Sequence, residues 1–282
     1  MKDKTCIIIC GPTAVGKTSY GIELALKYNT QIISADSRQC FKELNIGVAK
    51  PSPEQLRKVK HYFINTHSIH EEVNVRIFEE YALKSIHEIF EENDTAVVVG
   101  GTGLYIQAFS GGLDEIPNIK ENIRSEINEQ YGIRGFQWLH DEIKLRDPVF
   151  FSKGEMQNPH RMLRALEVKC STGKSILDFQ SGKKIKRGFK IKSILLELPR
   201  EQLYSNINLR VDRMMKDGLL AEAGDLFQYK NLNALQTVGY KELFDYMEGK
   251  FSLSVAIEEI KKNTRHYAKR QITWFNSRLK PV

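Results

Sequence analysis

The sequence predicts an α/β fold in which a parallel sheet is flanked by helices and interrupted by a helical insertion. A glycine-rich loop separates an apolar, strand-like run at 5–10 from a helical stretch at 19–28. Two more apolar runs, at 31–34 and 95–99, each end in a polar or glycine-containing turn. Between 114 and 190 strand-like runs are absent and helical patterns replace them. Alternating strands and helices are typical of a parallel sheet.

The glycine-rich loop matches the P-loop pattern G-x-x-x-x-G-K-[ST] at every position. Its glycines allow successive N–H groups to turn inward around an anion, and the following helix adds positive charge at its N-terminus. Lys17 can reach terminal phosphate oxygens, and Thr18 can offer its hydroxyl to Mg²⁺. The loop therefore predicts a P-loop NTPase-like core, of the kind found in ATP-binding proteins, that holds a diphosphate or a triphosphate. The predicted diphosphate-binding residues are Gly11, Pro12, Thr13, Ala14, Val15, Gly16, Lys17 and Thr18.

Composition describes an ordinary globular protein. Of 282 residues, 41% are hydrophobic and 27% charged. No apolar run approaches the ~20 residues of a membrane span, and the first strand begins too early for a signal peptide, so we expect a cytoplasmic protein without a membrane partner. The four cysteines form no C-x-x-C pair, which argues against a zinc site or a disulfide framework. The net charge of +7 is compatible with a polyanionic partner without requiring one.

Asp36 lies in the polar loop that follows the second predicted strand. Ligands of open α/β sheets gather at the carboxyl ends of the strands, so Asp36 is expected beside the P-loop. Three interpretations are open: a general base, a metal ligand, or the cap of an Asx turn.

The residues directly after the strand at 95–99 distinguish this chain from an ordinary P-loop NTPase. Such an enzyme places an Asp there to organise Mg²⁺, whereas this chain has Gly100 and Gly101. No Gln or Glu is evidently placed to position a hydrolytic water either. These features argue against an ATPase or GTPase and leave room for a P-loop that holds a diphosphate as a leaving group.

The domain prediction is a core of residues 1–113 and 191–282, with a helical insertion at 114–190. The end of the insertion, 183–190, carries five cations and no acid, and is either a solvated loop or a contact for RNA phosphates. The C-terminal stretch 261–279 has cations at helical spacing, with aromatic residues expected to face the core. Its basic face is either solvated or anion-binding.

Together these motifs resemble the bacterial tRNA dimethylallyltransferases, also called tRNA isopentenyltransferases, of the IPP transferase family. The P-loop alone is unspecific, but its combination with 34–39, 100–105 and 161–168 is highly specific. Two departures are Val48, where the family usually has Thr, and Asn158, where an acidic residue is common. The segments that carry the resemblance, in the family's order, are 11–18, 34–39, 46–51, 100–105, 161–168, 238–242 and 268–275.

The resemblance implies transfer of a dimethylallyl group from dimethylallyl diphosphate to N6 of the tRNA adenosine just 3′ of the anticodon, position 37, with release of diphosphate. Asp36 would act as general base, with Thr13 and Lys17 completing the predicted catalytic set. Mg²⁺ is the implied cofactor, and Thr18 its predicted protein ligand. We expect a monomer.

The implied RNA partner is the anticodon stem-loop, whose reacting base must be flipped out to reach a buried P-loop. Arg210 or Arg213 is expected to neutralise charge on the leaving group. The predicted tRNA-binding residues are Asp36, Ser37, Arg38, Gln39, Thr102, Arg124, Gln157, Asn158, Pro159, His160 and Arg161.

Other classes of protein share the P-loop. A small-molecule kinase could use Asp36 as its base, and a prenyltransferase acting on free AMP would not need the helical insertion. A P-loop RNA-binding protein without catalysis is a third class, against which Asp36 and Thr13 argue. Tight, strongly salt-dependent retention of tRNA favours the tRNA enzyme.

Overall fold

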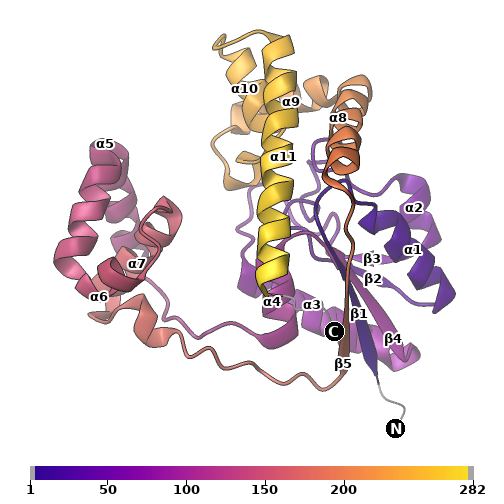
Figure 1. Ribbon diagram of the computed structural model, residues 1–282, viewed down its shortest axis with the longest axis horizontal. Coiled ribbons are helices and arrows are strands. Elements are labelled where there is room, and N and C mark those ends of the chain that lie inside the picture. Colours follow the sequence, from indigo (N-terminus) through magenta and orange to yellow (C-terminus); the bar gives the residue numbers. More distant parts are fainter. Residues whose placement is uncertain (1–3, 279–282) are drawn as a thin grey trace. The chain divides into compact units, whose positions relative to one another are not determined.

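A computed structural model of the chain, which describes residues 4–278, contains a five-stranded sheet with helices on both faces (Figure 1). Every strand pair is parallel and the order is β3-β2-β4-β1-β5. The P-loop NTPase-like α/β fold expected from the sequence is confirmed. The strands are β1 (Thr5–Cys10), β2 (Ile32–Ser34), β3 (His61–Tyr62), β4 (Thr95–Gly100) and β5 (Lys190–Leu195).

The described chain divides into two compact units. The core unit comprises residues 4–111 and 186–278, and the insertion unit is Gly112–Ile185. The boundaries expected from the sequence, after 113 and after 190, lie later than the structural ones, after 111 and after 185. The second boundary is earlier because the side chains of Arg187 and Phe189 pack within the core unit. No helix within 4–278 has both the length and the apolar character needed to cross a bilayer.

Helices cover both faces of the sheet, which explains why its central strands are continuous apolar runs. Alternate residues of β1 point to opposite faces, so Ile7 and Ile9 pack with α1 while Ile8 packs on the α3 side. The helices on the first face are α1 (Lys17–Lys27) and α2 (Pro53–Lys58), and those on the second are α3 (Val75–Glu92) and α4 (Gly103–Gly111) (Figure 1).

Between 75 and 92 apolar residues recur at a spacing of three to four, which predicts an amphipathic helix, and α3 spans these residues. Asn74 starts it, since its side-chain oxygen accepts hydrogen bonds from the backbone N–H groups of Arg76 and Ile77. Phe78 and Ile86 are fully buried against the sheet. A local cap and a 3.6-residue period were therefore sufficient to define this element.

The C-terminal third of the chain is helical and covers the P-loop side of the core unit. The last helix, α11, packs against α8, α10 and α4, and Gln271 near its end contacts Gly101 at the carboxyl edge of the sheet (Figure 1). Residue 279, the end of the predicted helix, lies outside the described residues. The elements are α8 (Arg200–Lys216), α9 (Leu219–Leu226), η2 (Phe227–Tyr229), η3 (Asn233–Leu235), α10 (Tyr240–Met247) and α11 (Leu253–Arg278).

The insertion unit is helical, as expected, and has a hydrophobic core of its own that includes Leu139, Met162 and Leu166. Helical patterns at 119–131 and 136–145 predict two helices, and the structure joins them in α5, which breaks at Gly135, where φ is 72°. The elements are α5 (Glu121–Arg146), α6 (Pro148–Lys153), α7 (Pro159–Thr172) and η1 (Ile176–Phe179).

Candidate active site

The P-loop connects β1 to α1 and is closed around the amine of Lys17. Lys17 Nζ donates to the carbonyl oxygens of Gly11 and Pro12 at 2.9 and 2.7 Å. At Gly11, φ is 144° and a Cβ would lie 2.5 Å from the carbonyl oxygen of Leu196, so only glycine fits there. Burial lowers the pKa of Lys17 to about 8, although Asp36 opposes this shift. The amine of Lys17 therefore lies where the P-loop pattern predicts that phosphate oxygens bind.

Asp36 follows β2 and forms the Asx turn, which is one of the three roles considered for it. Its Oδ1 accepts hydrogen bonds from the backbone N–H groups of Arg38 at 2.9 Å and Gln39 at 3.3 Å, which is an Asx turn. Within 4–278 no hydrogen-bond donor contacts its Oδ2. The same side chain lines the pockets described below. The turn thus fixes the carboxylate through one oxygen and leaves the other available for chemistry.

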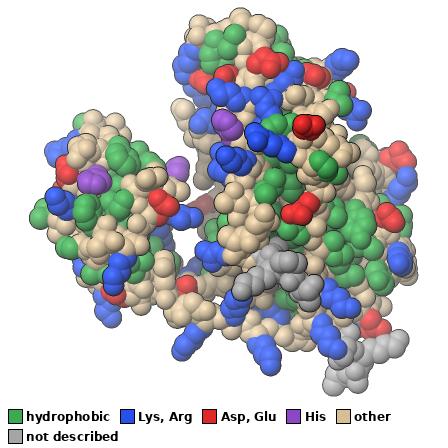
Figure 2. All heavy atoms as spheres, in the orientation of Figure 1, with side chains coloured by type: hydrophobic (Ala, Val, Ile, Leu, Met, Phe, Trp, Pro, Cys, Tyr) green, Lys and Arg blue, Asp and Glu red, His purple; other side chains and the backbone are tan. Residues whose placement is uncertain are grey.

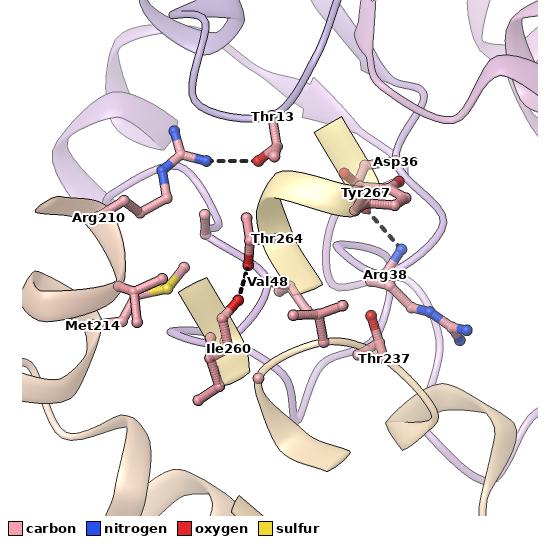
Figure 3. A pocket seen from close by; sticks show the side chains of 15 residues that line it. Thr13, Asp36, Arg38, Val48, Arg210, Met214, Thr237, Ile260, Thr264 and Tyr267 are labelled. Atoms are coloured by element: carbon pink, nitrogen blue, oxygen red, sulfur yellow. Dashed lines mark hydrogen bonds between the residues drawn. The ribbon is translucent and has the colours of Figure 1, made fainter. Parts of the chain in front are cut away.

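Thr13 and Arg210 meet at the mouth of the P-loop. Arg210 Nη1, from α8, donates to Thr13 Oγ1 at 3.0 Å (Figure 3). A guanidinium can only donate, so the Thr13 hydroxyl accepts this bond and keeps its own proton for another partner. Arg213, the other arginine considered from the sequence, is exposed and lines none of the pockets described here. Of the two, only Arg210 belongs to the site.

Two adjoining pockets open at this point. One, with about 620 Å³ of empty space, is polar and follows the P-loop from Thr13 to Ser19. The other, with about 730 Å³, has a largely apolar wall. That wall includes Val48, Met214 and Ile260 (Figure 3). Val211 and Val238 also line it. The residues common to both pockets are Thr13, Asp36, Val48, Ala49, Arg210 and Tyr267.

Tyr267 and Gln271, both on α11, are site residues that the sequence interpretation missed. Tyr267 was expected to face the core, but it lines both pockets beside Asp36 (Figure 3). Burial, and then the neighbouring Asp36, raise its pKa far above the ordinary value, so it stays a neutral phenol. A signal was present: residues four apart on a helix share a face.

The loop at 45–49 forms one wall of both pockets and is held by a carboxylate distant in sequence. Glu222 of α9 accepts hydrogen bonds from the backbone N–H groups of 45, 46 and 47 at 2.9 to 3.1 Å. It also accepts one from the hydroxyl of Tyr240 at 2.6 Å. The Tyr240 ring occupies the space that a Cβ on Gly47 would need, at 2.6 Å. This wall is therefore rigidly placed against the P-loop.

A third cavity adjoins the apolar pocket at Arg38, Thr237, Val238 and Tyr267. Its lining also includes two cations, Lys241 and Arg270, and the aromatic ring of Phe251. Of the predicted tRNA-binding residues, Ser37 and Arg38 line this cavity, whereas Gln39 lines the polar pocket. Thr102 Oγ1 accepts a hydrogen bond from the Ser37 N–H at 3.1 Å and so holds the loop that follows β2.

The other predicted tRNA-binding residues lie in the insertion unit. Asn158 caps α7 by accepting hydrogen bonds from the backbone N–H groups of His160 and Arg161, whose side chains are exposed. Pro159 is the first residue of that helix, and Gln157 precedes the cap. Arg124, on α5, is 3.7 Å from the buried carboxylate of Glu167. Asn is among the residues that cap helices best, as an acidic Asp at this position would also do.

The basic run at 183–190 is not a continuous surface of exposed cations, as its sequence suggested. Lys183, Lys184 and Lys186 are exposed, but Arg187 is not a free surface cation. Its guanidinium pairs with Glu79 and donates to the carbonyl oxygens of Ala108 and Phe109. Its side chain is only 10% exposed, because it anchors the returning chain to α3 and α4.

The predicted basic face of α11 is partly neutralised. Figure 2 shows acidic side chains among the lysines and arginines of this face. Lys261 pairs with Asp212 at 2.9 Å, and Lys262 with Glu259 at 3.0 Å. Lys269 and Arg270 remain exposed. Any anion-binding surface on this helix therefore centres on 269–270, beside the third cavity.

A family model described as IPP transferase matches residues 39–278. The chain belongs to the IPP transferase family. A tRNA dimethylallyltransferase of Flavobacterium psychrophilum is 50% identical over 275 residues, which cover 95% of this chain and 90% of the relative. The corresponding protein of Flavobacterium johnsoniae is 48% identical over 278 residues, 96% of this chain and 90% of its own length.

The chain is also similar to solved structures of this family. A tRNA isopentenylpyrophosphate transferase of Bacillus halodurans aligns with a TM-score of 0.69 at 35% identity, covering 98% of this chain and 88% of that one. A eukaryotic dimethylallyltransferase acting on tRNA aligns with a TM-score of 0.80 at 28% identity, covering 96% and 70%. The family resemblance read from the sequence is confirmed, and with it the expectation of an enzyme.

Proposed function

We propose that this chain transfers a dimethylallyl group from dimethylallyl diphosphate to N6 of the adenosine at position 37 of tRNA, and that it does so as a monomer. The observation that supports this most directly is the pair of adjoining pockets, one polar and one apolar, that share Thr13, Asp36 and Arg210. An allylic diphosphate has the same two parts.

The diphosphate takes the polar pocket. The P-loop N–H groups, the N-terminus of α1 and Lys17 face its oxygens, and Lys17 exchanges the carbonyls of Gly11 and Pro12 for phosphate. The apolar pocket beyond Thr13 accepts the five-carbon chain against Val48, Met214 and Ile260. The carbon that reacts then lies at the shared boundary, within reach of the Asp36 carboxylate.

Asp36 is the general base. The exocyclic amine of adenine is a poor nucleophile because its lone pair is delocalised into the ring. As the N6–carbon bond forms and the carbon–oxygen bond to diphosphate breaks, Oδ2 of Asp36 takes the proton that N6 loses. The Asx turn holds the carboxylate through Oδ1 during this step.

Thr13 and Arg210 act on the leaving group. The Thr13 hydroxyl accepts from Arg210, so its proton points away from the guanidinium and can be donated to the diphosphate oxygen that gains charge. Arg210 itself places a positive charge next to that oxygen. Such preorganised donors stabilise charge that develops in the transition state.

Mg²⁺ fits this donor set as an ion shared between substrate and protein. Within 4–278 no cluster of three or more His, Cys, Asp or Glu residues forms a protein-only metal site. Mg²⁺ commonly uses one or two protein oxygens together with substrate phosphates and water, and the Thr18 hydroxyl lies in the polar pocket for that purpose. When bound, the ion would neutralise part of the diphosphate charge.

The tRNA anticodon loop approaches from the third cavity, which adjoins the apolar pocket at Arg38 and Tyr267. A flipped adenine entering there reaches Asp36 from the side opposite the P-loop. Arg38 donates from Nη1 to the carbonyl oxygen of Asn233 at 2.9 Å, which fixes its position at this entrance.

Incubation of unmodified tRNA with dimethylallyl diphosphate and Mg²⁺, followed by mass spectrometry of the nucleosides, tests the proposal. We expect one prenyl group on adenosine. AMP in place of tRNA tests the mononucleotide alternative, and ATP with release of ADP tests a kinase. Prenylated AMP with unmodified tRNA, or phosphoryl transfer in place of prenyl transfer, would overturn the proposal.

A further inference from the structure

Gln271 is a buried amide in the last third of α11 with backbone partners in two different loops. Its Oε1 accepts a hydrogen bond from the N–H of Thr13 at 2.8 Å. Its Nε2 donates to the carbonyl oxygen of Gly101 at 2.9 Å. Because one partner is a donor and the other an acceptor, the orientation of the amide is fixed. One side chain thus joins the P-loop to the glycine turn after β4.

The glycine turn is shaped to admit this amide. A Cβ on Gly101 would lie 2.3 Å from Gln271 Nε2, far inside van der Waals contact. At Gly103 a Cβ would lie 2.4 Å from the ring of Trp274, three residues further along α11. The two glycines therefore allow α11 to press against the turn. Where an ordinary P-loop NTPase has an Asp after β4, this chain has a glycine turn that leaves room for the side chain of Gln271.

We infer that Gln271 is a positioning residue for the prenyl transfer proposed above, acting through Thr13. Thr13 is held twice: at its backbone N–H by Gln271 and at its hydroxyl by Arg210. Its N–H is therefore not part of the anion cradle, and Thr13 serves the diphosphate through its hydroxyl. Without Gln271, the N–H of Thr13 and the buried C=O of Gly101 lose their partners, and Thr13 loses one of the two contacts that hold it. The inference rests on the proposed function.

The first test is Gln271→Met, which keeps the size of the side chain and removes both hydrogen bonds. We expect kcat for tRNA prenylation to fall about 10- to 100-fold, as small misplacements of reacting groups do, while KM for tRNA is unchanged. The matched control is Ala256→Gly, a fully buried position on the same helix that lines none of the three pockets. It should lower the melting temperature and leave kcat near the wild-type value.

The second test is a double-mutant cycle with Gly101→Ala. The added methyl group displaces the Gln271 amide, so Gly101→Ala alone should reproduce the loss of kcat. In Gln271→Ala the space for that methyl group exists, so the double variant should be no slower than Gln271→Ala. Additive losses, or a Gln271→Met enzyme with wild-type kcat, would overturn the inference. A wild-type enzyme that prenylates no tRNA would instead remove the proposed function.

Discussion

Arg210 and Thr13 are 197 positions apart in the chain, yet a 3.0 Å hydrogen bond joins them where the two pockets meet. The bond makes α8 part of the P-loop site and orients the threonine hydroxyl. The two arginines of α8 therefore differ: Arg210 makes this contact in the site, whereas Arg213 is exposed to solvent.

Replacing Arg210 with Ala is expected to lower kcat for prenyl transfer by roughly 10²- to 10³-fold, the cost of losing one preorganised donor to a developing negative charge. Arg213→Ala is the matched control, because it removes the same charge from the same helix outside the pockets. Steady-state kinetics with both variants measure the difference. Equal losses in the two variants would mean that long-range charge, and not the contact with Thr13, is responsible.

Asp36→Asn should distinguish the proposed role of Asp36 as general base from its role in the Asx turn. The amide oxygen of Asn can still accept from the N–H groups of Arg38 and Gln39, so the Asx turn and the melting temperature should be preserved. The basicity is lost, and we expect kcat to fall ~10²-fold or more with tRNA affinity unchanged. Single-turnover rates and filter binding measure the two. Recovery of activity in excess Mg²⁺ would assign Asp36 to the metal instead.

Lys17 is expected to make diphosphate binding depend on pH. In the free protein its pKa is lowered to about 8, so it is charged below that pH and becomes neutral as the pH rises through it. Calorimetric affinity for inorganic diphosphate should therefore weaken above about pH 8, while tRNA affinity does not follow this change. The free energy of unfolding should rise over the same pH range. Between about pH 8 and the ordinary pKa of 10.5, the unfolded chain binds a proton on Lys17 that the folded chain has lost.

The control for this prediction is Lys17→Met, which removes the titrating group. Titration of the diphosphate itself affects both proteins equally, so the comparison isolates Lys17. A pH dependence of the same size in the Met variant would contradict the assignment.

The basic run divides into surface and anchor residues. Joint replacement of Lys183, Lys184 and Lys186 by Ala should leave the fold intact, weaken tRNA binding and reduce the slope of log K against log salt by up to ~0.9 for each lost phosphate contact. An unchanged slope would identify a solvated loop. Arg187→Ala should instead lower the free energy of unfolding by about 3 kcal/mol, since it leaves Glu79 without its partner in a mostly buried pair. Urea denaturation distinguishes the two.

Local patterns in the sequence determined the elements and the phosphate loop. The P-loop residues must follow one another directly to wrap an anion, so their spacing in the sequence is their spacing in space. The bounds of α3 follow from a cap and a period that are both local. Asp36 could be placed beside the P-loop because parallel strands bring their carboxyl ends to one edge.

The tertiary structure alone decided which distant side chains complete the site. Helical periodicity shows that 261–279 has two faces, but not that Tyr267 and Gln271 meet the P-loop while Lys261 pairs with Asp212. The same holds for Glu222, which supports the wall at 45–47 from another helix, and for Arg187, whose charge is used inside the core unit. These contacts join residues from different elements that are distant in the sequence, and they form only when packing sets the rotation of each helix against the sheet.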